Sequence, residues 1–308
     1  MRRQGVFSGG ASGDTEEKKK TLGDEKKIRE WQKTFALFCR NKMSVISLIV
    51  VLLIILMSIF ASVLAPYDPL EINMSAIQKP PSQEHILGTD TIGRDLLSRL
   101  LYAGRVSLSV SVVAVAIYAV VGVVIGAAAG YFGGTFDTVV MRLTDAIMCF
   151  PLMVLMIVLV AIMGQNILNI VLIIAIVGWP SLARLVRAEV LSLKNQEFVE
   201  SAVASGEGTF SIIFRYLIPN CAPSIIVNIT FGIATAILME AGLSFLGLGI
   251  QPPQASWGYM LMDAQSITIL TRMPWLWLSP SLMIFITVMS INFVGDGLRS
   301  ALDPKMKR

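Results

Sequence analysis

Residues 197–220 read EFVESAVASGEGTFSIIFRYLIPN and interrupt a chain that is otherwise strongly apolar. Small residues recur at helical spacing in the first half of this stretch, where Ala202, Ser205 and Gly206 follow Phe198. Residues three and four apart lie on one face of a helix. The spacing therefore predicts a short helix whose small-residue face lets another backbone approach closely.

The second half of the stretch predicts a second short helix. Gly206 and Gly208 break the first helix, and Thr209 is the predicted N-cap of the next one. Phe210 belongs to its apolar stripe. Pro219 is predicted to end it, because proline lacks an amide donor and disfavours helical geometry in the preceding residue. Such a hairpin has no core of its own, so it must pack against the rest of the chain or a partner.

The composition around this stretch is that of a membrane protein. The 308 residues are 55% hydrophobic and only 15% charged, and the mean hydropathy is +0.70. Soluble domains average roughly 25% charged residues. The sequence therefore predicts an integral membrane protein.

A helix needs roughly 20 residues to cross a hydrocarbon core, and six apolar runs come close to this length or exceed it. They are residues 43–66, 106–132, 146–164, 167–183, 224–249 and 275–295. The third run contains Pro151, and the fifth contains one carboxylate, Glu240. We therefore expect an all-α fold with six transmembrane helices.

The distribution of basic residues predicts the orientation of these spans. Of 25 Lys and Arg residues, only Lys79, Arg94, Arg99, Arg105 and Arg272 fall in the segments that lie outside if the N-terminus is inside. Cytoplasmic loops carry the excess of positive charge. Both termini and the segment 197–220 are therefore predicted to be cytoplasmic.

Two amphipathic segments flank the first span. A helix from about residue 31, with Phe35 and Phe38 among basic residues, is expected to lie in the lipid headgroups, behind a disordered tail of residues 1–30. The second segment precedes the second span and is predicted to be a helix on the outer surface. It alternates Ile92, Leu96, Leu97, Leu100 and Leu101 with Arg94, Asp95 and Arg99.

Motifs of catalysis and of metal binding are absent from the sequence. It has no GxxxxGK[ST] phosphate-binding loop, its three cysteines lack CxxC spacing, and its single histidine, His85, excludes a His-pair metal site. We expect no catalytic residue, metal or cofactor in this chain, and no nucleic-acid partner. We interpret His85 as a solvated residue of an outer loop.

Two further features near the outer side are candidates for function. Glu240 is the one carboxylate within a predicted span, and intramembrane ionisable residues are functional candidates by default. It either lines the external mouth of a path, facing a substrate amine, or bonds to helix ends at an outer gate. The second feature is an outer loop with Gln251, Pro252, Pro253 and Trp257, a candidate for docking an external protein, although proline-rich loops are common.

The segment 197–220 resembles the cytoplasmic EAA loop of ABC-transporter permease subunits, whose pattern is Glu-Ala-Ala, three residues, Gly, nine residues, then Ile-x-Leu-Pro. The triplet 200–202, Gly206 and Pro219 match this pattern, whereas Tyr216 replaces its first isoleucine. The resemblance implies that the first helix is a coupling helix that docks into a separate ATP-binding subunit. The coupling-loop residues are then Glu200, Ser201, Ala202, Ser205, Gly206, Glu207, Thr209, Phe210 and Pro219.

Five other phrases resemble the C-type permease subunit of dipeptide and oligopeptide importers. They are LAPYDP (64–69), LGTDTIGRDLLSRLLYAGRVSL (87–108), AGYFGG (129–134), SFLGLGIQPPQASWG (244–258) and GDGLRSALDP (295–304). The resemblance extends from about Cys39 to the end of the chain. It implies a type I ABC importer permease fold, with an ABC transmembrane domain over residues 105–296 preceded by residues 31–104, and a cytoplasmic tail over 297–308.

This family implies a set of partners and a mechanism. The partners would be a second, homologous permease subunit, two ATPase subunits that bind ATP and Mg, and an external solute-binding protein, for which the docking candidates are Gln251, Pro252, Pro253 and Trp257. Together they would import peptides across a bacterial or archaeal cytoplasmic membrane by alternating access. The alternatives are import of nickel or another small solute by the same architecture, and an ATP-independent channel or membrane scaffold. Neither a channel nor a scaffold would need a coupling helix.

Overall fold

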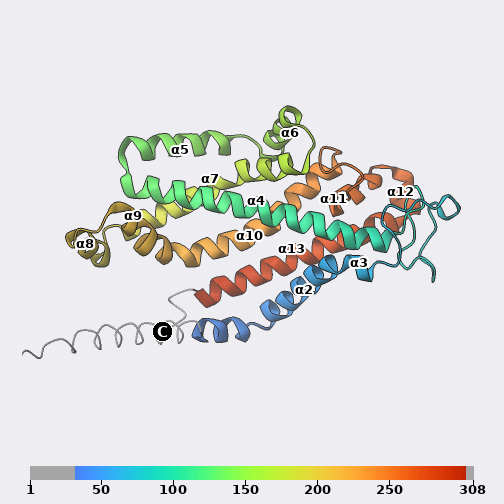
Figure 1. The fold of residues 1–308 in the computed structure, drawn as a ribbon, viewed down its shortest axis with the longest axis horizontal. Coiled ribbons are helices and arrows are strands. Elements are labelled where there is room, and N and C mark those ends of the chain that lie inside the picture. Colours follow the sequence, from blue (N-terminus) through green and yellow to red (C-terminus); the bar gives the residue numbers. More distant parts are fainter. Residues whose placement is uncertain (1–31, 303–308) are drawn as a thin grey trace, which may run out of the picture.

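The computed structural model describes residues 32–302 (Figure 1), and this part of the chain is almost entirely helical, with no β-strand. The predictions for residues 1–31 and 303–308, which include the disordered tail and the end of the C-terminal tail, lie outside this range. Residues 32–40 are helical. The helices that follow are α2 (Lys42–Ile59), α3 (Ala61–Leu64), α4 (Leu96–Phe132), α5 (Gly134–Cys149), α6 (Leu152–Met163), α7 (Ile167–Leu193), α8 (Glu197–Ala204), α9 (Thr209–Ser211), α10 (Ile218–Phe245), α11 (Trp257–Met260), α12 (Ile267–Arg272) and α13 (Pro274–Leu302).

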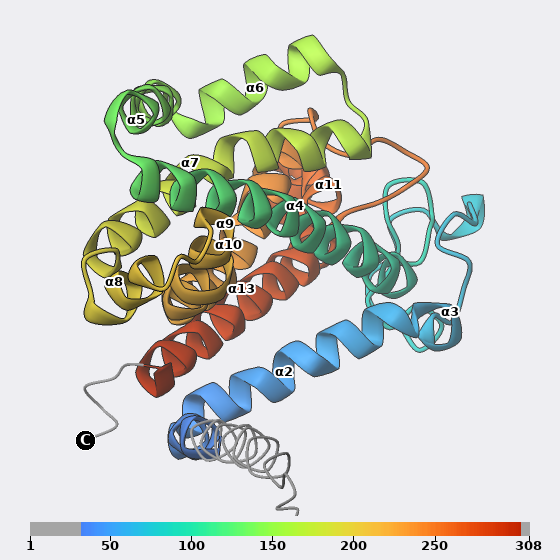
Figure 2. The same ribbon diagram turned by 60° about the vertical axis from the view of Figure 1, so that its left-hand side comes forward.

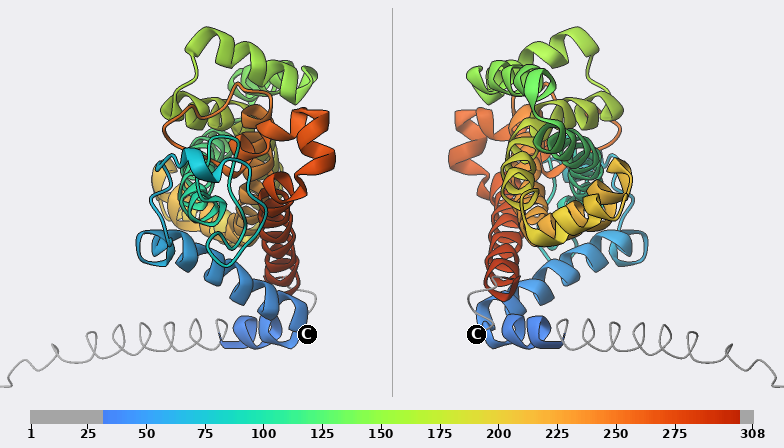
Figure 3. Two further views of the ribbon diagram at one scale, coloured as in Figure 1. Left: turned by 90° about the vertical axis from the view of Figure 1, so that its right-hand side faces the viewer. Right: turned by 90° about the vertical axis from the view of Figure 1, so that its left-hand side faces the viewer.

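Five long helices run along the length of the molecule (Figure 1): α2, α4, α7, α10 and α13. One end of the bundle, here called the α8 end, holds α8, α9, residues 32–40 and the last turns of α13. The opposite end, the α11 end, holds α3, α11, α12 and the loop between α3 and α4. Figures 2 and 3 show α5 and α6 on one side of the bundle and α2 on the other.

The predicted membrane spans are confirmed with one exception. Among the described residues, five segments are long and apolar enough to cross a membrane, and one of them is α10 together with the turns before it. A bent pair of helices brings the number up to six. The third predicted span, residues 146–164, is not one helix, because the chain bends by 95° between α5 and α6. The bend lies at Phe150 and Pro151, and proline disfavours helical geometry in the residue before it.

Polar caps and one glycine set the ends of the long helices. The Asp95 carboxylate accepts a hydrogen bond from the Ser98 amide (2.8 Å) at the start of α4, and Asn166 accepts one from the Leu168 amide (3.1 Å) at the start of α7. Gly133, with a φ of +65°, ends α4. The apolar runs between these caps become single continuous helices.

Close packing of α4 against α7 depends on three glycines spaced four residues apart. A Cβ atom on Gly126 would lie 2.4 Å from the carbonyl oxygen of Ala183, and one on Gly130 would lie 2.9 Å from that of Arg187. A Cβ on Gly122 would lie 3.1 Å from the Leu182 side chain. Small residues at this spacing let transmembrane helices approach closely. Two ion pairs, Asp137–Arg187 and Asp145–Arg184, attach α5 to α7.

The segment before the second span differs from its prediction as a surface helix. Residues 96–101 already belong to α4, with Leu96 and Leu100 buried, and the chain before them is a loop built on buried ion pairs. Asp90 binds both Arg94 (2.7 Å) and Arg99. The charged residues that alternate with apolar ones in this segment therefore form ion pairs within the protein instead of facing a membrane surface. The division at residues 104 and 105 stays a prediction, and α4 runs across it.

His85 is buried rather than solvated, since only 4% of its surface is exposed. Its Nδ1 lies 3.0 Å from Oδ1 of Asp95, and its ring lies 4.9 Å from that of Tyr67. The same loop that holds Asp90 therefore holds the histidine as well. Gly88 and Gly93, with φ values of +80° and +84°, give the loop its turns.

Candidate coupling surface and central cavity

The helical hairpin predicted for the segment 197–220 is present at the α8 end, with a defined elbow. The Gly206 amide donates to the Val203 carbonyl (3.0 Å), and the Glu207 amide donates to the Ala202 carbonyl (3.1 Å). This pair of bonds is a Schellman motif, which requires a left-handed residue after the helix. Gly206 supplies it with a φ of +77°. Within this chain a Cβ on Gly206 would meet nothing within 4 Å. Glycine is therefore needed at this position for its backbone conformation and not for lack of space.

One face of α8 is anchored in the core, and the other is exposed. Val199 and Ala202 are buried in the same apolar cluster as Ile212 and Leu217. The structure thus buries Ala202, whereas Ser205 and Gly206 are exposed, so the predicted small-residue face is divided between inside and outside. The exposed surface of the hairpin, here called the coupling surface, contains Glu197, Phe198, Glu200, Ser201, Val203, Ser205, Gly206 and Phe210.

The coupling surface combines apolar and acidic side chains. Phe210 is 76% exposed, Val203 is 53% exposed and Phe198 is 38% exposed. Large apolar side chains at an end of the molecule that carries two exposed carboxylates, Glu197 and Glu200, indicate a protein-binding surface rather than contact with lipid.

Glu207 ties the elbow to the turns that lead into α10. Its carboxylate accepts hydrogen bonds from the hydroxyls of Ser211 (2.6 Å) and Tyr216 (2.5 Å). These bonds hold the pKa of Glu207 below its usual value of 4.5, and the bond from Ser211 has the larger effect. The carboxylate is therefore charged at neutral pH, and the contact is lost only when acid lowers the pH through this depressed pKa. Tyr216, the departure from the family pattern, thus has a specific partner.

Two predicted helix boundaries in the hairpin are wrong. Gly208, not Thr209, is the N-cap residue, and Thr209 is the first helical residue. Pro219 does not end a helix, because residues 209–245 form one continuous helical segment. A π-helix over Ile212–Leu217 precedes the proline. Its wider turn lets the chain pass a residue that donates no amide hydrogen bond.

Replacing Tyr216 by phenylalanine is expected to lower the transport activity that the sequence resemblance implies without abolishing it, because Glu207 keeps the hydroxyl of Ser211. The double change Tyr216→Phe with Ser211→Ala is expected to lower activity further. Tyr131→Phe is the matched control, since no hydrogen bond of the Tyr131 hydroxyl is found among residues 32–302. Uptake by cells that express equal amounts of each variant measures the effect. Equal uptake for Tyr216→Phe and Tyr131→Phe would contradict a role for the Glu207 contact.

Glu240 lies in a buried polar cluster near the α11 end of α10. Its side chain is fully buried and accepts hydrogen bonds from the hydroxyls of Ser244 (2.6 Å) and Ser107 (3.1 Å). The Ser107 oxygen also accepts the backbone amide of Trp257 (3.1 Å). This cluster joins α4, α10 and the start of α11. Of the two sequence-based interpretations, the geometry favours a bond between helix ends over a carboxylate facing an open path.

Replacing Glu240 by leucine is expected to destabilise the folded protein, because the Ser107 and Ser244 hydroxyls lose their acceptor inside the bundle. A buried polar group left without its partner costs about 1–3 kcal/mol. Glu240→Gln keeps an acceptor oxygen and is expected to cost less than half as much. Thermal unfolding of the purified protein in detergent measures both. A Glu240→Leu protein as stable as the wild type would show that the carboxylate does not hold these helices together.

The predicted docking loop is only partly exposed. Gln251, Pro252 and Pro253 are exposed, so they remain candidates for contact with an external protein. Trp257 is fully buried, and its indole nitrogen donates to the Leu100 carbonyl (3.0 Å). Its role in this structure is to pack α11 against α4, so it is not available for docking.

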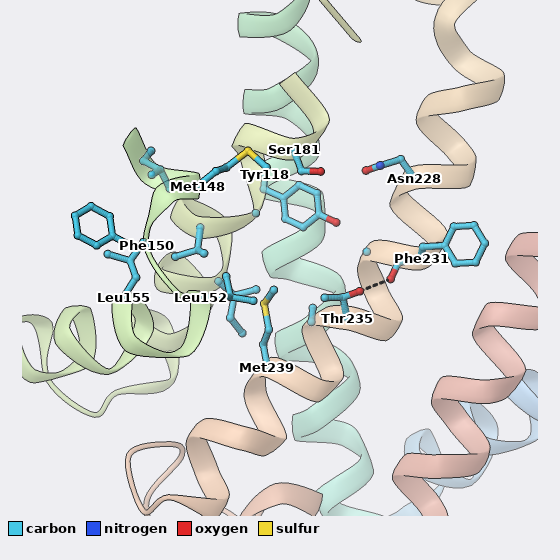
Figure 4. A pocket seen from close by; sticks show the side chains of 16 residues that line it. Tyr118, Met148, Phe150, Leu152, Leu155, Ser181, Asn228, Phe231, Thr235 and Met239 are labelled. Carbon is cyan, nitrogen blue, oxygen red and sulfur yellow. Dashed lines mark hydrogen bonds between the residues drawn. The ribbon is translucent and has the colours of Figure 1, made fainter. Parts of the chain in front are cut away.

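A cavity of about 370 Å³, here called the central cavity, lies midway along α4, α7 and α10 beside the α5–α6 bend (Figure 4). It was not predicted from the sequence, because its residues come from four separate segments. Its wall is largely apolar and includes Phe150, Leu152 and Met239. A second hollow of about 430 Å³ shares Met148, Ser181 and Asn228 with it and extends toward the α8 end. Pockets of this size and character bind small ligands in many proteins.

These features define a polytopic helical membrane protein with an exposed helical hairpin at one end and a cavity between its spans. Residues 32–302 contain no group of three or more His, Cys, Asp or Glu side chains able to hold a metal ion. Residues 122–308 match the family described as binding-protein-dependent transport system inner membrane component. The chain belongs to this family. Residues 30–81 match the N-terminal transmembrane domain of oligopeptide transport permease C.

Curated relatives match this chain in sequence over nearly their whole length. The oligopeptide transport system permease protein OppC of Bacillus subtilis is 39% identical over 93% of this chain and 95% of its own. The dipeptide transport system permease protein DppC of Alkalihalophilus pseudofirmus is 41% identical over 91% of each chain. The glutathione transport system permease protein GsiD of Pectobacterium atrosepticum is 40% identical over 92% of this chain and 94% of its own. The resemblance stated from the sequence is confirmed.

Proposed function

We propose that this permease subunit belongs to an ATP-driven importer of dipeptides or oligopeptides. The observation that carries the proposal is the identity of about 40% with permeases named for oligopeptide, dipeptide and glutathione transport, which extends over nine-tenths of the chain. The central cavity supports it, because a largely apolar wall with a few polar groups suits short peptides.

The proposed partners follow from the family and from the coupling surface. Two ATPase subunits would bind ATP and Mg, one of them receiving α8 and Phe210 in a groove. A homologous second permease subunit would complete the path, and a solute-binding protein would dock at the α11 end, where Gln251, Pro252 and Pro253 are exposed. This chain would perform no covalent chemistry.

The proposed orientation places both termini and the α8 end in the cytoplasm of a bacterial or archaeal cell. The excess of Lys and Arg outside the predicted outer segments supports it. So does the fold, because residues 32–40, α8 and the last turns of α13 lie toward one end of the bundle (Figure 1).

The mechanism we propose is alternating access driven through the hairpin. Closure of the ATPase subunits would move α8, whose buried residues Val199 and Ala202 pack against the turns that begin α10. The bond between Glu207 and Tyr216 would pass that motion to the same turns. Because residues 209–245 form one helical segment, movement at the elbow would reach the wall of the central cavity.

Uptake of labelled peptides and of nickel, in cells lacking only this chain and in cells with it restored, tests the function. Restored ATP-dependent uptake of di- or oligopeptides is the expected result. Restored nickel uptake without peptide uptake would show that the importer carries nickel rather than peptides. Uptake that persists when the partner ATPases are inactivated by mutation of their phosphate-binding loops would indicate an ATP-independent channel instead.

A further inference from the structure

Three polar side chains face the central cavity without a partner. They are Tyr118 of α4, Ser181 of α7 and Asn228 of α10, and Figure 4 shows Ser181 and Asn228 pointing toward each other beside the tyrosine ring. Among residues 32–302, none of the three side chains takes part in a hydrogen bond. Thr235 also lines the cavity, but its hydroxyl already donates to the Phe231 carbonyl (3.0 Å).

The position of Tyr118 is fixed by the two helices that face it. A Cβ on Gly178 of α7 would lie 2.6 Å from Cδ1 of the tyrosine ring, and a Cβ on Gly232 of α10 would lie 1.7 Å from its hydroxyl oxygen. The ring therefore fills a slot that two glycines leave open, and only 6% of its surface is exposed. The hydroxyl oxygen is not enclosed by protein atoms, so it is open to the cavity and can hydrogen-bond to water or to a ligand there.

Charge is absent from this wall. Within the part of the chain that the structure describes, no Asp, Glu, Lys, Arg or His lines the central cavity. Hydroxyl and amide groups together offer donors and acceptors, which are the groups that a peptide bond needs. The remaining wall, from Phe150, Leu152 and Met239 among others, suits an uncharged side chain.

We propose that the central cavity is a transient binding site for the peptide in transit. Tyr118, Ser181 and Asn228 hydrogen-bond its amide backbone, and the apolar wall receives one uncharged side chain. This inference rests on the proposed peptide import. The second hollow extends the site toward the α8 end, where Arg184 and Glu189 are the first charged residues that a peptide meets. At the other end Met239 borders the cavity, and its neighbour Glu240 belongs to the buried cluster that joins α4, α10 and α11.

The test uses uptake by cells that carry the complete transporter. Labelled Ala-Phe-Ala, Ala-Lys-Ala and Ala-Asp-Ala are supplied at saturating concentration, so that capture by the solute-binding protein does not limit the rate. Tyr118→Phe removes only the hydroxyl, and Asn228→Leu only the amide. Each is expected to lower the maximal rate for Ala-Phe-Ala about two- to tenfold, the effect of one hydrogen bond. Thr230→Val is the control, because that hydroxyl donates to the Ile226 carbonyl (2.9 Å) and lies off the cavity.

A charge placed in the site gives a readout that loss of stability does not. Asn228→Asp is expected to raise the ratio of Ala-Lys-Ala to Ala-Asp-Ala uptake about tenfold, because opposite charges attract strongly in a medium of low dielectric constant. Rates that match those of Thr230→Val, or an unchanged ratio, would overturn the binding site while leaving peptide import intact. If cells with the wild-type transporter take up none of the three labelled peptides, the proposed function itself is wrong.

Discussion

Replacing Gly206 by valine is expected to abolish transport while leaving the permease in the membrane. The φ of this residue is +77°, and a left-handed backbone costs an ordinary L-residue about 1–2 kcal/mol, with a β-branched one at the upper end. The strained elbow would turn α8 away from its place above the turns that begin α10. Uptake and the ATPase rate stimulated by substrate measure the loss, and the amount of the chain in the membrane is measured alongside.

Two neighbouring substitutions separate backbone conformation from side-chain size. Gly208→Ala is expected to behave like the wild type, because the φ of Gly208 is −69° and a Cβ there would meet nothing within 4 Å. Gly206→Asn is expected to retain more activity than Gly206→Val, since asparagine tolerates the left-handed region. If Gly206→Ala is active and Gly206→Asn is not, the glycine is needed as a small contact for a partner, as the sequence suggested, rather than for its φ.

The sequence predicted the long helices well because a membrane span needs only a sufficiently long apolar run. Four of the six predicted runs correspond to single long helices, α2, α4, α7 and α13, and a fifth lies mainly in α10. Proline was the main source of error. Pro180 lies inside α7, and Pro219 lies inside a continuous segment, whereas Pro151 stands at a 95° bend. Whether a neighbouring residue satisfies the freed carbonyl decides between these outcomes, and local sequence does not contain that information.

The candidate site was predicted only where its residues are contiguous. The hairpin of α8 was found because its glycines and its family pattern lie in one short stretch. The central cavity brings together Tyr118, Ser181 and Asn228, which are far apart in the sequence and have no distinctive pattern around them. Trp257 and His85 were expected at the surface because they follow or precede spans. Both are buried, since loops at the α11 end pack on α4.

Replacing Gly126 by leucine is expected to prevent the protein from accumulating in a folded form. A side chain at this position meets the backbone of Ala183, first the carbonyl oxygen at 2.4 Å and then Cα at 2.9 Å. Backbone atoms of a helix move only with the helix, so α4 and α7 would have to separate along their whole contact. Overpacking of a core typically costs about 1–3 kcal/mol for a small increase in volume, and a leucine adds several heavy atoms. The amount of protein in the membrane and its thermal unfolding in detergent measure the effect.

An alanine pair isolates the cause of this effect. The Cβ of Gly126→Ala would lie 2.4 Å from the backbone oxygen of Ala183, whereas that of Gly242→Ala would lie 2.3 Å from Cε of Met153. The nominal overlaps are alike, but the end of a methionine side chain can rotate away. Gly126→Ala is therefore expected to lower the unfolding temperature well below that of Gly242→Ala. Equal losses would mean that the added volume matters rather than the rigidity of the atoms that it meets.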